Sequence, residues 1–245
     1  MSRSLALEVA VQDAAGVRVA REIGAARVEL TQGLALGGLT PSAATLDLAL
    51  EVSADGGPEI HVLVRPRAGG FQYDAGELKT IERDIRFAVE RGAHGVVIGA
   101  QDASGGLDAD ALKRLRDAAG AASVTLHRVI DVTPDLLASL AIVRELGFAR
   151  VLTSGGASAA IDGVDTLRAL VSAAEGAVQI MAGSGVTSAN VVEIAGTGVD
   201  AVHFSAKRTV AEQGGVRMGS ASDGVGGYEV TDLAEAQAVR TALGL

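Results

Sequence analysis

The pentapeptide GAARV at residues 24–28 returns at three later points of the chain, as GAHGV (92–96), GFARV (147–151) and GVDAV (198–202). In each copy a helix-patterned segment runs up to the glycine, and a short run of β-forming residues contains the valine. Glycine ends helices in a left-handed conformation that other residues avoid. The repeat therefore predicts four joints between a helix and the next strand, and it divides the chain into strand–helix–strand–helix pairs.

Eight short apolar runs fit this division of the chain. Between them lie amphipathic segments such as residues 76–92, in which Leu78, Ile81 and Ile85 fall on one helical face. Pro41 with Ser42, and Pro134 with Asp135, are typical helix starts. The predicted strands are residues 5–11, 27–31, 60–66, 95–100, 123–130, 149–154, 178–183 and 201–206.

Eight strand–helix units in 245 residues are typical of a (β/α)8 TIM-type barrel. The rival α/β fold is an open doubly wound sheet, but no glycine fingerprint follows the first predicted strand. We therefore predict one barrel domain over residues 1–245. A Gly/Ser-rich loop at about residues 207–230 is expected at the barrel mouth, before a last helix capped by Thr231 or Asp232.

Composition argues against several classes of protein. The net charge is −9 and no long basic stretch occurs, which argues against a nucleic-acid partner. No apolar run approaches the ~20 residues that cross a bilayer, and the first residues make a poor signal peptide. Because the chain has no cysteine, it has no disulfide framework and no thiolate chemistry. These observations favour a cytoplasmic protein without a membrane partner.

The stretch VTLHRVIDVTP at residues 124–134 places charged and titratable groups at the end of a predicted strand. In a barrel, the inner face of each strand lines the active site near its carboxyl end. His127 and Asp131 share one face if the fifth strand stays extended, and other strands carry similar groups. The predicted pocket residues are Glu8, Glu29, Arg65, Arg67, His127, Asp131, Ser154, Gly183, Gly185, His203 and Ser205.

Part of this set favours binding of an anion. Arginines such as Arg65 and Arg67 suit a carboxylate or a phosphate. Gly183 and Gly185 expose backbone N–H groups after the seventh strand, where barrel enzymes often hold an anion, although a tight turn alone also explains glycines there.

Another part favours proton transfer or metal binding. Glu29, His127 and Asp131 are candidates for general acid–base catalysis. His127 and His203, together with carboxylates, could bind copper or another divalent metal. Any single Glu or Arg of the set could instead belong to a buried ion pair that holds the barrel centre together.

Six motifs follow one another along nearly the whole chain: VELTQGLALGGLTPS (28–42), HVLVRPRAGGFQY (61–73), VTLHRVIDVTPD (124–135), RVLTSGGA (150–157), IMAGSGV (180–186) and VHFSA (202–206). In this order they resemble the CutC family of copper homeostasis proteins. The resemblance implies a TIM-type barrel, a cytoplasmic location, homo-oligomers and a role in copper binding or tolerance. It also implies that the family's shared pocket consists of Glu8, Glu29, Arg65, His127, Asp131, Ser154 and His203.

The chain departs from the family pattern where copper chemistry matters. Many members carry cysteines at the positions of Thr31 and Gln72, and Cu(I) prefers sulfur ligands. Two functions therefore stay open. The first is the implied copper-homeostasis or copper-binding role. The second is a barrel enzyme, of isomerase, lyase or hydrolase type, that acts on a small anionic, phosphorylated or sugar-like substrate with Glu29 or His127 as acid or base.

Overall fold

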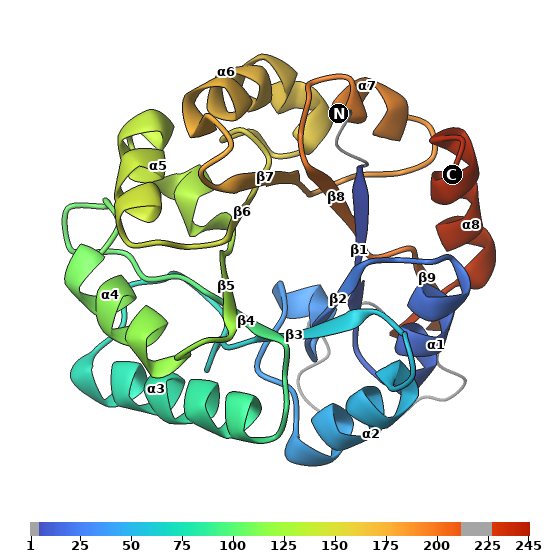
Figure 1. Cartoon of the computed structure of the whole chain (residues 1–245), viewed down its shortest axis with the longest axis horizontal. Helices are drawn as coiled ribbons and strands as arrows, with labels where there is room; N and C mark the ends of the chain where they lie inside the picture. Colours follow the sequence, from blue (N-terminus) through green and yellow to red (C-terminus); the bar gives the residue numbers. More distant parts are fainter. Residues whose placement is uncertain (1–4, 212–226) are drawn as a thin grey trace.

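The computed structural model describes residues 5–211 and 227–245. Eight parallel strands close into a barrel in which each strand pairs with its neighbours in sequence order, and β1 pairs with β8 (Figure 1). This confirms the predicted (β/α)8 fold. The strands are β1 (Ala6–Val11), β2 (Arg27–Leu30), β3 (Glu59–Leu63), β4 (Gly95–Ile98), β5 (Ser123–Leu126), β6 (Arg150–Thr153), β7 (Gln179–Ala182) and β8 (Ala201–Phe204).

The helices form the outer ring of Figure 1. Ser42, Asp135 and Asp232 cap α2, α5 and α8 with their side chains, as the sequence predicts. Within the described residues, no helix combines the length and apolar character that crossing a membrane requires. The helices are α1 (Ala14–Glu22), α2 (Ala43–Ser53), α3 (Ala75–Glu90), α4 (Ala109–Ala118), α5 (Leu136–Glu145), α6 (Val164–Ala174), α7 (Val191–Ala195) and α8 (Leu233–Ala242), with 3₁₀ turns η1 (Leu34–Leu36), η2 (Arg128–Val132) and η3 (Ala160–Gly163).

The four repeated glycines make the predicted joints. Gly24, Gly92, Gly147 and Gly198 have φ angles of 66°, 99°, 71° and 90°, so each adopts the left-handed region after a helix. A residue with a Cβ is strained there, which is why the repeat keeps glycine at these points.

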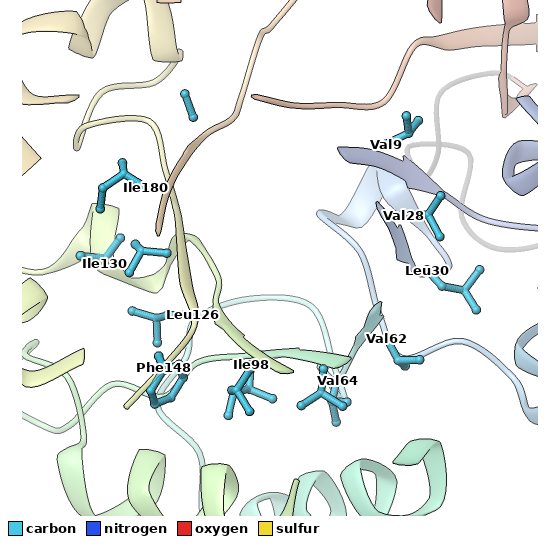
Figure 2. Close-up of a cluster of buried hydrophobic side chains, with 14 of the residues drawn as sticks. Val9, Val28, Leu30, Val62, Val64, Ile98, Leu126, Ile130, Phe148 and Ile180 are labelled. Atoms are coloured by element: carbon cyan, nitrogen blue, oxygen red, sulfur yellow. The ribbon is translucent and has the colours of Figure 1, made fainter. Parts of the chain in front are cut away.

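Outward-facing strand residues make the main core, between the barrel and its helices. Figure 2 shows Val9, Val28, Leu30, Val62 and Ile98 among these side chains, and all of them are buried. Burial of a Val or Leu side chain stabilises the fold by roughly 1.5–3 kcal/mol each. The helices therefore cover the outer face of the ring of strands, and the inner face can carry polar groups.

Below the barrel mouth, the inner face carries a buried polar layer. Arg27 donates from Nε to Glu8 Oε2 at 2.8 Å, which joins β2 to β1. Arg150 donates to Thr125 Oγ1 and to Gln179 Oε1, both at 3.0 Å, which joins β6 to β5 and β7. The buried ion pair that the sequence allowed for is therefore present at Glu8.

Two predictions about chain segments are wrong. The fifth strand ends at Leu126, and η2 turns the following residues, so His127 and Asp131 do not share a strand face. The predicted loop at 207–230 begins and ends in strands: β9 (Lys207–Ala211) pairs antiparallel with β10 (Gly227–Thr231). Residues 212–226 lie outside the described residues.

Candidate functional site

A cavity of about 570 Å³ opens at the carboxyl ends of the strands. This volume lies in the range of small-molecule sites. Phe71, Arg128, Ser184 and Lys207 line it in addition to the predicted residues. Of the predicted pocket residues, six line it: Glu29, Arg65, His127, Gly185, His203 and Ser205.

A carboxylate–imidazole–carboxylate chain leads from the barrel interior to this cavity. Glu8 Oε1 lies 3.0 Å from His203 Nδ1, and His203 Nε2 lies 3.7 Å from Glu29 Oε2. Glu8 is fully enclosed, whereas Glu29 and His203 reach the cavity wall. Glu8 therefore fixes the imidazole, and the imidazole faces the carboxyl group that a ligand can touch.

The three groups have shifted protonation equilibria. Burial raises the pKa of Glu8, but the hydrogen bond and charge of His203, with Arg27, outweigh burial and hold that pKa well below its usual range. Burial lowers the pKa of His203, yet the Glu8 hydrogen bond and the charges of Glu29 and Glu8 raise it overall. Burial raises the pKa of Glu29, although His203 opposes this. These shifts favour the ionised form of Glu8 and the protonated forms of His203 and Glu29.

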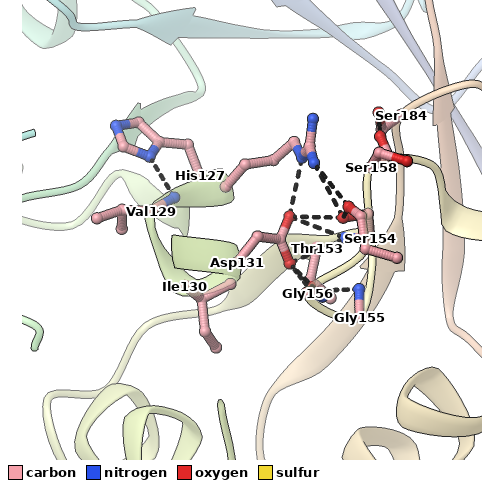
Figure 3. A network of polar contacts seen from close by, with 12 residues as sticks. His127, Val129, Ile130, Asp131, Thr153, Ser154, Gly155, Gly156, Ser158 and Ser184 are labelled. Carbon is pink, nitrogen blue, oxygen red and sulfur yellow. Dashed lines mark hydrogen bonds and ion pairs between the residues drawn. The ribbon is translucent and has the colours of Figure 1, made fainter. Parts of the chain in front are cut away.

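The pKa of His127 is shifted in the opposite direction from that of His203. Its Nδ1 accepts a hydrogen bond from the Val129 N–H at 3.1 Å, which Figure 3 shows. Burial, with the nearby charge of Arg65, lowers the pKa of His127 to about 3, so the ring is neutral. Gly99 lies directly beside the ring, because a Cβ at Gly99 would come within 2.3 Å of His127 Cε1.

Arg65 lines the cavity but also holds the surrounding loops. Its Nη1 donates to the carbonyls of Leu36 and Gly38, each at 3.0 Å, and its Nη2 donates to the carbonyl of Gly69 at 2.7 Å. The sequence predicts an anion ligand for this guanidinium, whereas three backbone carbonyls already accept from it. The main role of Arg65 is therefore to fix the loops after β2 and β3.

Arg128 is the arginine that an anion can reach. Its Nε donates to Asp131 Oδ2 at 2.8 Å and its Nη2 donates to Ser154 Oγ at 2.9 Å. Asp131 in turn accepts from the N–H groups of Ser154 and Gly156 and from the Thr153 hydroxyl, as Figure 3 shows. Because these donors occupy both of its oxygens, Asp131 positions Arg128, and the geometry gives no support to its predicted role as a catalytic base.

The remaining predicted residues lie outside the cavity wall. Arg67 forms an ion pair with Glu77 and donates to the carbonyls of its own loop, so it does not contribute to the pocket as predicted. Ser154 is buried behind Arg128. Gly183 supports the site from below, since a Cβ there would meet Leu152 Cδ1 at 2.5 Å and His203 Cβ at 3.3 Å.

The loop after β7 presents a row of backbone donors to the cavity. Ser184, Gly185 and Val186 line it, and within the described part of the chain their N–H groups donate no hydrogen bond. Asn190 fixes this loop by accepting from Thr187 N–H and donating to the Gly185 carbonyl, both at 2.8 Å. Free N–H groups in a row are suited to an anion.

Sequence reasoning missed Arg128, Phe71 and Lys207 as cavity residues. Strand alternation leaves the direction of Arg128 open between a helix and the barrel mouth, because the alternation of an extended strand does not continue through the η2 turn. The signal that could have found it is Pro134, which follows shortly and marks a turn. Lys207 reaches the mouth because its position in the β9–β10 pair holds it there, with Nζ 2.6 Å from Glu229 Oε1.

The donor set does not suit a metal centre. Among the residues with a described structure, no group of three or more His, Asp or Glu side chains gathers to hold an ion. Glu8 and Glu29 contact opposite nitrogens of His203, so these three do not converge on one point. The full sequence contains no cysteine to supply the thiolate that Cu(I) prefers.

The family model described as the CutC family matches residues 5–208. The chain belongs to the CutC family. A CutC protein of Xanthomonas campestris pv. campestris strain B100 is 42% identical over 236 residues, which cover 96% of this chain and 97% of the relative. A CutC protein of Caulobacter vibrioides is 45% identical over 200 residues, which cover 81% of this chain and 80% of the relative. The family predicted from the six motifs is thereby confirmed.

Solved structures show the same fold. A CutC protein from Streptococcus agalactiae, described as a candidate copper homeostasis protein, is 31% identical, with a TM-score of 0.78 over 82% of this chain and 98% of that one. Thiamine phosphate pyrophosphorylase from Pyrococcus furiosus has a TM-score of 0.62 at 15% identity, over 99% and 97% of the two chains. The second likeness concerns the barrel alone, because fold does not imply function.

Proposed function

We propose that this CutC-family protein binds a small organic anion at the barrel mouth and exchanges a proton with it through Glu29. The role in copper homeostasis that the description of the Streptococcus agalactiae relative names would then be indirect, through the ligand's metabolism and not through chelation of copper. Within the wider set of barrel enzymes, this reading corresponds to an isomerase or lyase type of activity.

One observation carries the proposal: Glu29 shares a cavity with the cations Arg128 and Lys207. Burial raises the pKa of Glu29 above the usual carboxyl value, although the charge of His203 opposes this. A carboxyl group positioned beside a bound ligand can act as a general acid or base. The cations attract an anionic ligand and hold it beside this carboxyl group. Positioning of this kind lowers the barrier to the reaction, because the two reacting groups no longer have to find each other.

Arg128 and the loop of Ser184–Val186 are the groups that would hold the anionic end of the ligand. Asp131 and Ser154 fix the Arg128 guanidinium through its Nε and Nη2. An arginine held in place loses less side-chain entropy on binding. The N–H groups of Ser184, Gly185 and Val186, which donate to no described residue, belong to the loop after the seventh strand, a frequent phosphate site in barrels.

Arg128→Ala is expected to weaken binding of inorganic phosphate at least tenfold, since one charge-assisted hydrogen bond contributes about 1.5–3 kcal/mol. ³¹P NMR titration at low ionic strength measures the dissociation constant. Arg168→Ala is the matched control: Arg168 also pairs with an aspartate three residues away, Asp165, but lies exposed on α6. Equal phosphate affinity in Arg128→Ala and the wild type contradicts the proposal.

Direct copper binding is the second candidate, and it rests on His127 and His203 lining one cavity. The environment of these imidazoles opposes it. Nδ1 of each ring is already engaged, by Val129 and by Glu8. Arg65, Arg128 and Lys207 repel a cation from the same space.

Isothermal titration with Cu(I) and with Cu(II) separates the two candidates. We expect no binding of Cu(I) tighter than micromolar, and we expect the double variant His127→Ala/His203→Ala to leave any weaker copper uptake unchanged. Tight uptake that disappears in the double variant would favour direct copper binding and would count against the organic anion.

A cytoplasmic location and a homo-oligomeric state complete the proposal. Both are implied by the resemblance to the CutC family, and the net charge of −9 fits a protein without a nucleic-acid partner. Cell fractionation tests the location, and size-exclusion chromatography with light scattering tests the assembly.

A further inference from the structure

Within residues 5–211 and 227–245, two buried N–H donors beside the cavity have no hydrogen-bond acceptor. They are Nε2 of His127 and Nε of Arg65, and both residues line the cavity. A buried donor without an acceptor costs about 1–3 kcal/mol. Of the unpaired buried side-chain atoms in the described residues, these two are the ones whose residues line the cavity, where a ligand could supply the acceptor. Both are attached to side chains that the rest of the structure holds firmly.

The tautomer of His127 follows from its contacts. Nδ1 accepts from the Val129 N–H, so it carries no proton, and a neutral ring must then carry its proton on Nε2. The pKa of about 3 keeps the ring neutral at physiological pH. His127 therefore presents a fixed N–H donor and cannot act as a general base at neutral pH.

Arg65 presents its second donor in the same region. Its Nη1 and Nη2 are bound to the carbonyls of Leu36, Gly38 and Gly69, which leaves Nε–H as the unused donor. The Phe71 ring lies 4.7 Å from the His127 ring and 5.4 Å from the Arg65 guanidinium carbon. One aromatic side chain thus packs against both groups.

We propose that His127 Nε2–H and Arg65 Nε–H form a subsite for a carbonyl oxygen, so that the ligand is a short carbonyl compound carrying a phosphate or carboxylate. This inference rests on the proposed function and adds the chemical class of the substrate. The anionic end lies at Arg128 and the Ser184–Val186 loop, and the carbonyl end lies at the two unused donors.

The reaction at this site is exchange of the proton beside the carbonyl group. The ionised Glu29 carboxylate takes a proton from the adjacent carbon, the C–H electron pair forms a C=C bond, and the carbonyl π pair moves to oxygen. The two donors stabilise that oxyanion, which neutral imidazole does well because its N–H is fixed in place. Return of a proton from Glu29 to the same carbon re-forms the carbonyl group and regenerates the carboxylate, so no further reactant is needed.

Dihydroxyacetone phosphate and glycerol 3-phosphate test the carbonyl subsite, because they differ only in the carbonyl group. We expect the wild type to bind the ketone about tenfold more tightly, which corresponds to ~1.4 kcal/mol. We also expect deuterium from D₂O to enter the carbon-bound positions of the ketone. Both readouts use NMR on the full-length protein.

Two variants of His127 form a matched pair. His127→Asn keeps an acceptor at the position of Nδ1 for Val129 but has no donor at the position of Nε2, whereas His127→Gln places an amide N–H near Nε2. The ketone preference is expected to fall to about one in His127→Asn and to persist in His127→Gln. A preference that persists fully in His127→Asn overturns the inference.

A third readout does not depend on any variant. In ¹⁵N-labelled wild-type protein, the Nε2–H signal of His127 should move on addition of the ketone and stay in place with inorganic phosphate. If phosphate binds through Arg128 but the two phosphate esters bind equally, the inference fails and the proposed function stands. If the wild type binds no phosphate at all, both fail.

Discussion

Glu8→Ala is expected to lower the free energy of unfolding by about 3–5 kcal/mol, the usual cost of removing one partner of a buried ion pair. Without Glu8, the buried Arg27 guanidinium and the His203 imidazolium lose their shared carboxylate. For a chain of this size, the melting temperature should fall by roughly 6–20 °C. Thermal and urea denaturation followed by circular dichroism measure both quantities.

The control for Glu8 is an exposed ion pair of similar geometry. Asp47 accepts from Arg91 at 2.7 Å, but the side chains of Arg91 and Asp47 are 46% and 41% exposed. Asp47→Ala should therefore change the stability by no more than about 1 kcal/mol. A loss below that value for Glu8→Ala as well would show that the barrel interior is better hydrated than the structure indicates.

The stability difference between the wild type and Glu8→Ala should depend on pH. Glu8 has a lowered pKa, so its contribution is present above the usual carboxylate pKa and is lost as the pH falls toward the folded value. His203 has a raised pKa, so its contribution is present below the usual imidazole pKa and is lost as the pH rises through the folded value. The difference should be largest between these limits, near pH 5–6.

Glu29→Gln is expected to slow the proton exchange by about 10²–10⁴-fold, the usual contribution of a positioned acid or base. Deuterium incorporation into dihydroxyacetone phosphate measures the rate. In the wild type the rate should rise with pH through the raised pKa of Glu29, because only the carboxylate form accepts a proton. An unchanged rate in Glu29→Gln removes Glu29 from the mechanism.

Glu29→Gln also separates the effect of Glu29 on proton exchange from its effect on the stability of the fold. A raised pKa means that folding favours protonated Glu29, so its stabilising contribution is lost as the pH rises through that value. Glutamine carries no charge and resembles the protonated form. We therefore expect Glu29→Gln to unfold no more easily than the wild type at neutral pH and to be the more stable protein in alkali.

Local sequence signals predicted the strands and helices of the barrel, because each signal depends on only a few neighbouring residues. Gly24 and Gly147 end helices with positive φ wherever a helix must stop, and the alternation around Glu8 points the carboxylate inward. Alternation likewise placed Glu29 and His203 on one side of the ring. The loop boundaries at 207–230 and the length of the fifth strand were wrong, because no local preference reports a hairpin partner or a 3₁₀ turn.

The roles within the site depend on contacts between distant segments. Arg65 and Arg128 look alike in the sequence, yet Arg65 is bound to three carbonyls while Asp131 and Ser154 hold Arg128 beside the cavity. His127 and His203 also look alike, yet burial lowers the pKa of His127 to about 3, whereas contacts with Glu8 and Glu29 raise the pKa of His203.

The sequence by itself determined the barrel, its order of strands, the inward direction of its polar groups and the family. Only the tertiary structure decided which arginine is bound to backbone carbonyls, which histidine has a raised pKa and which donors of the described residues stay without an acceptor. The physical reason is the sequence distance over which each kind of signal acts. Backbone propensity and side-chain alternation act over a few neighbouring residues, whereas a pKa or a hydrogen bond depends on the groups that the closed barrel brings together, such as Glu8 with His203.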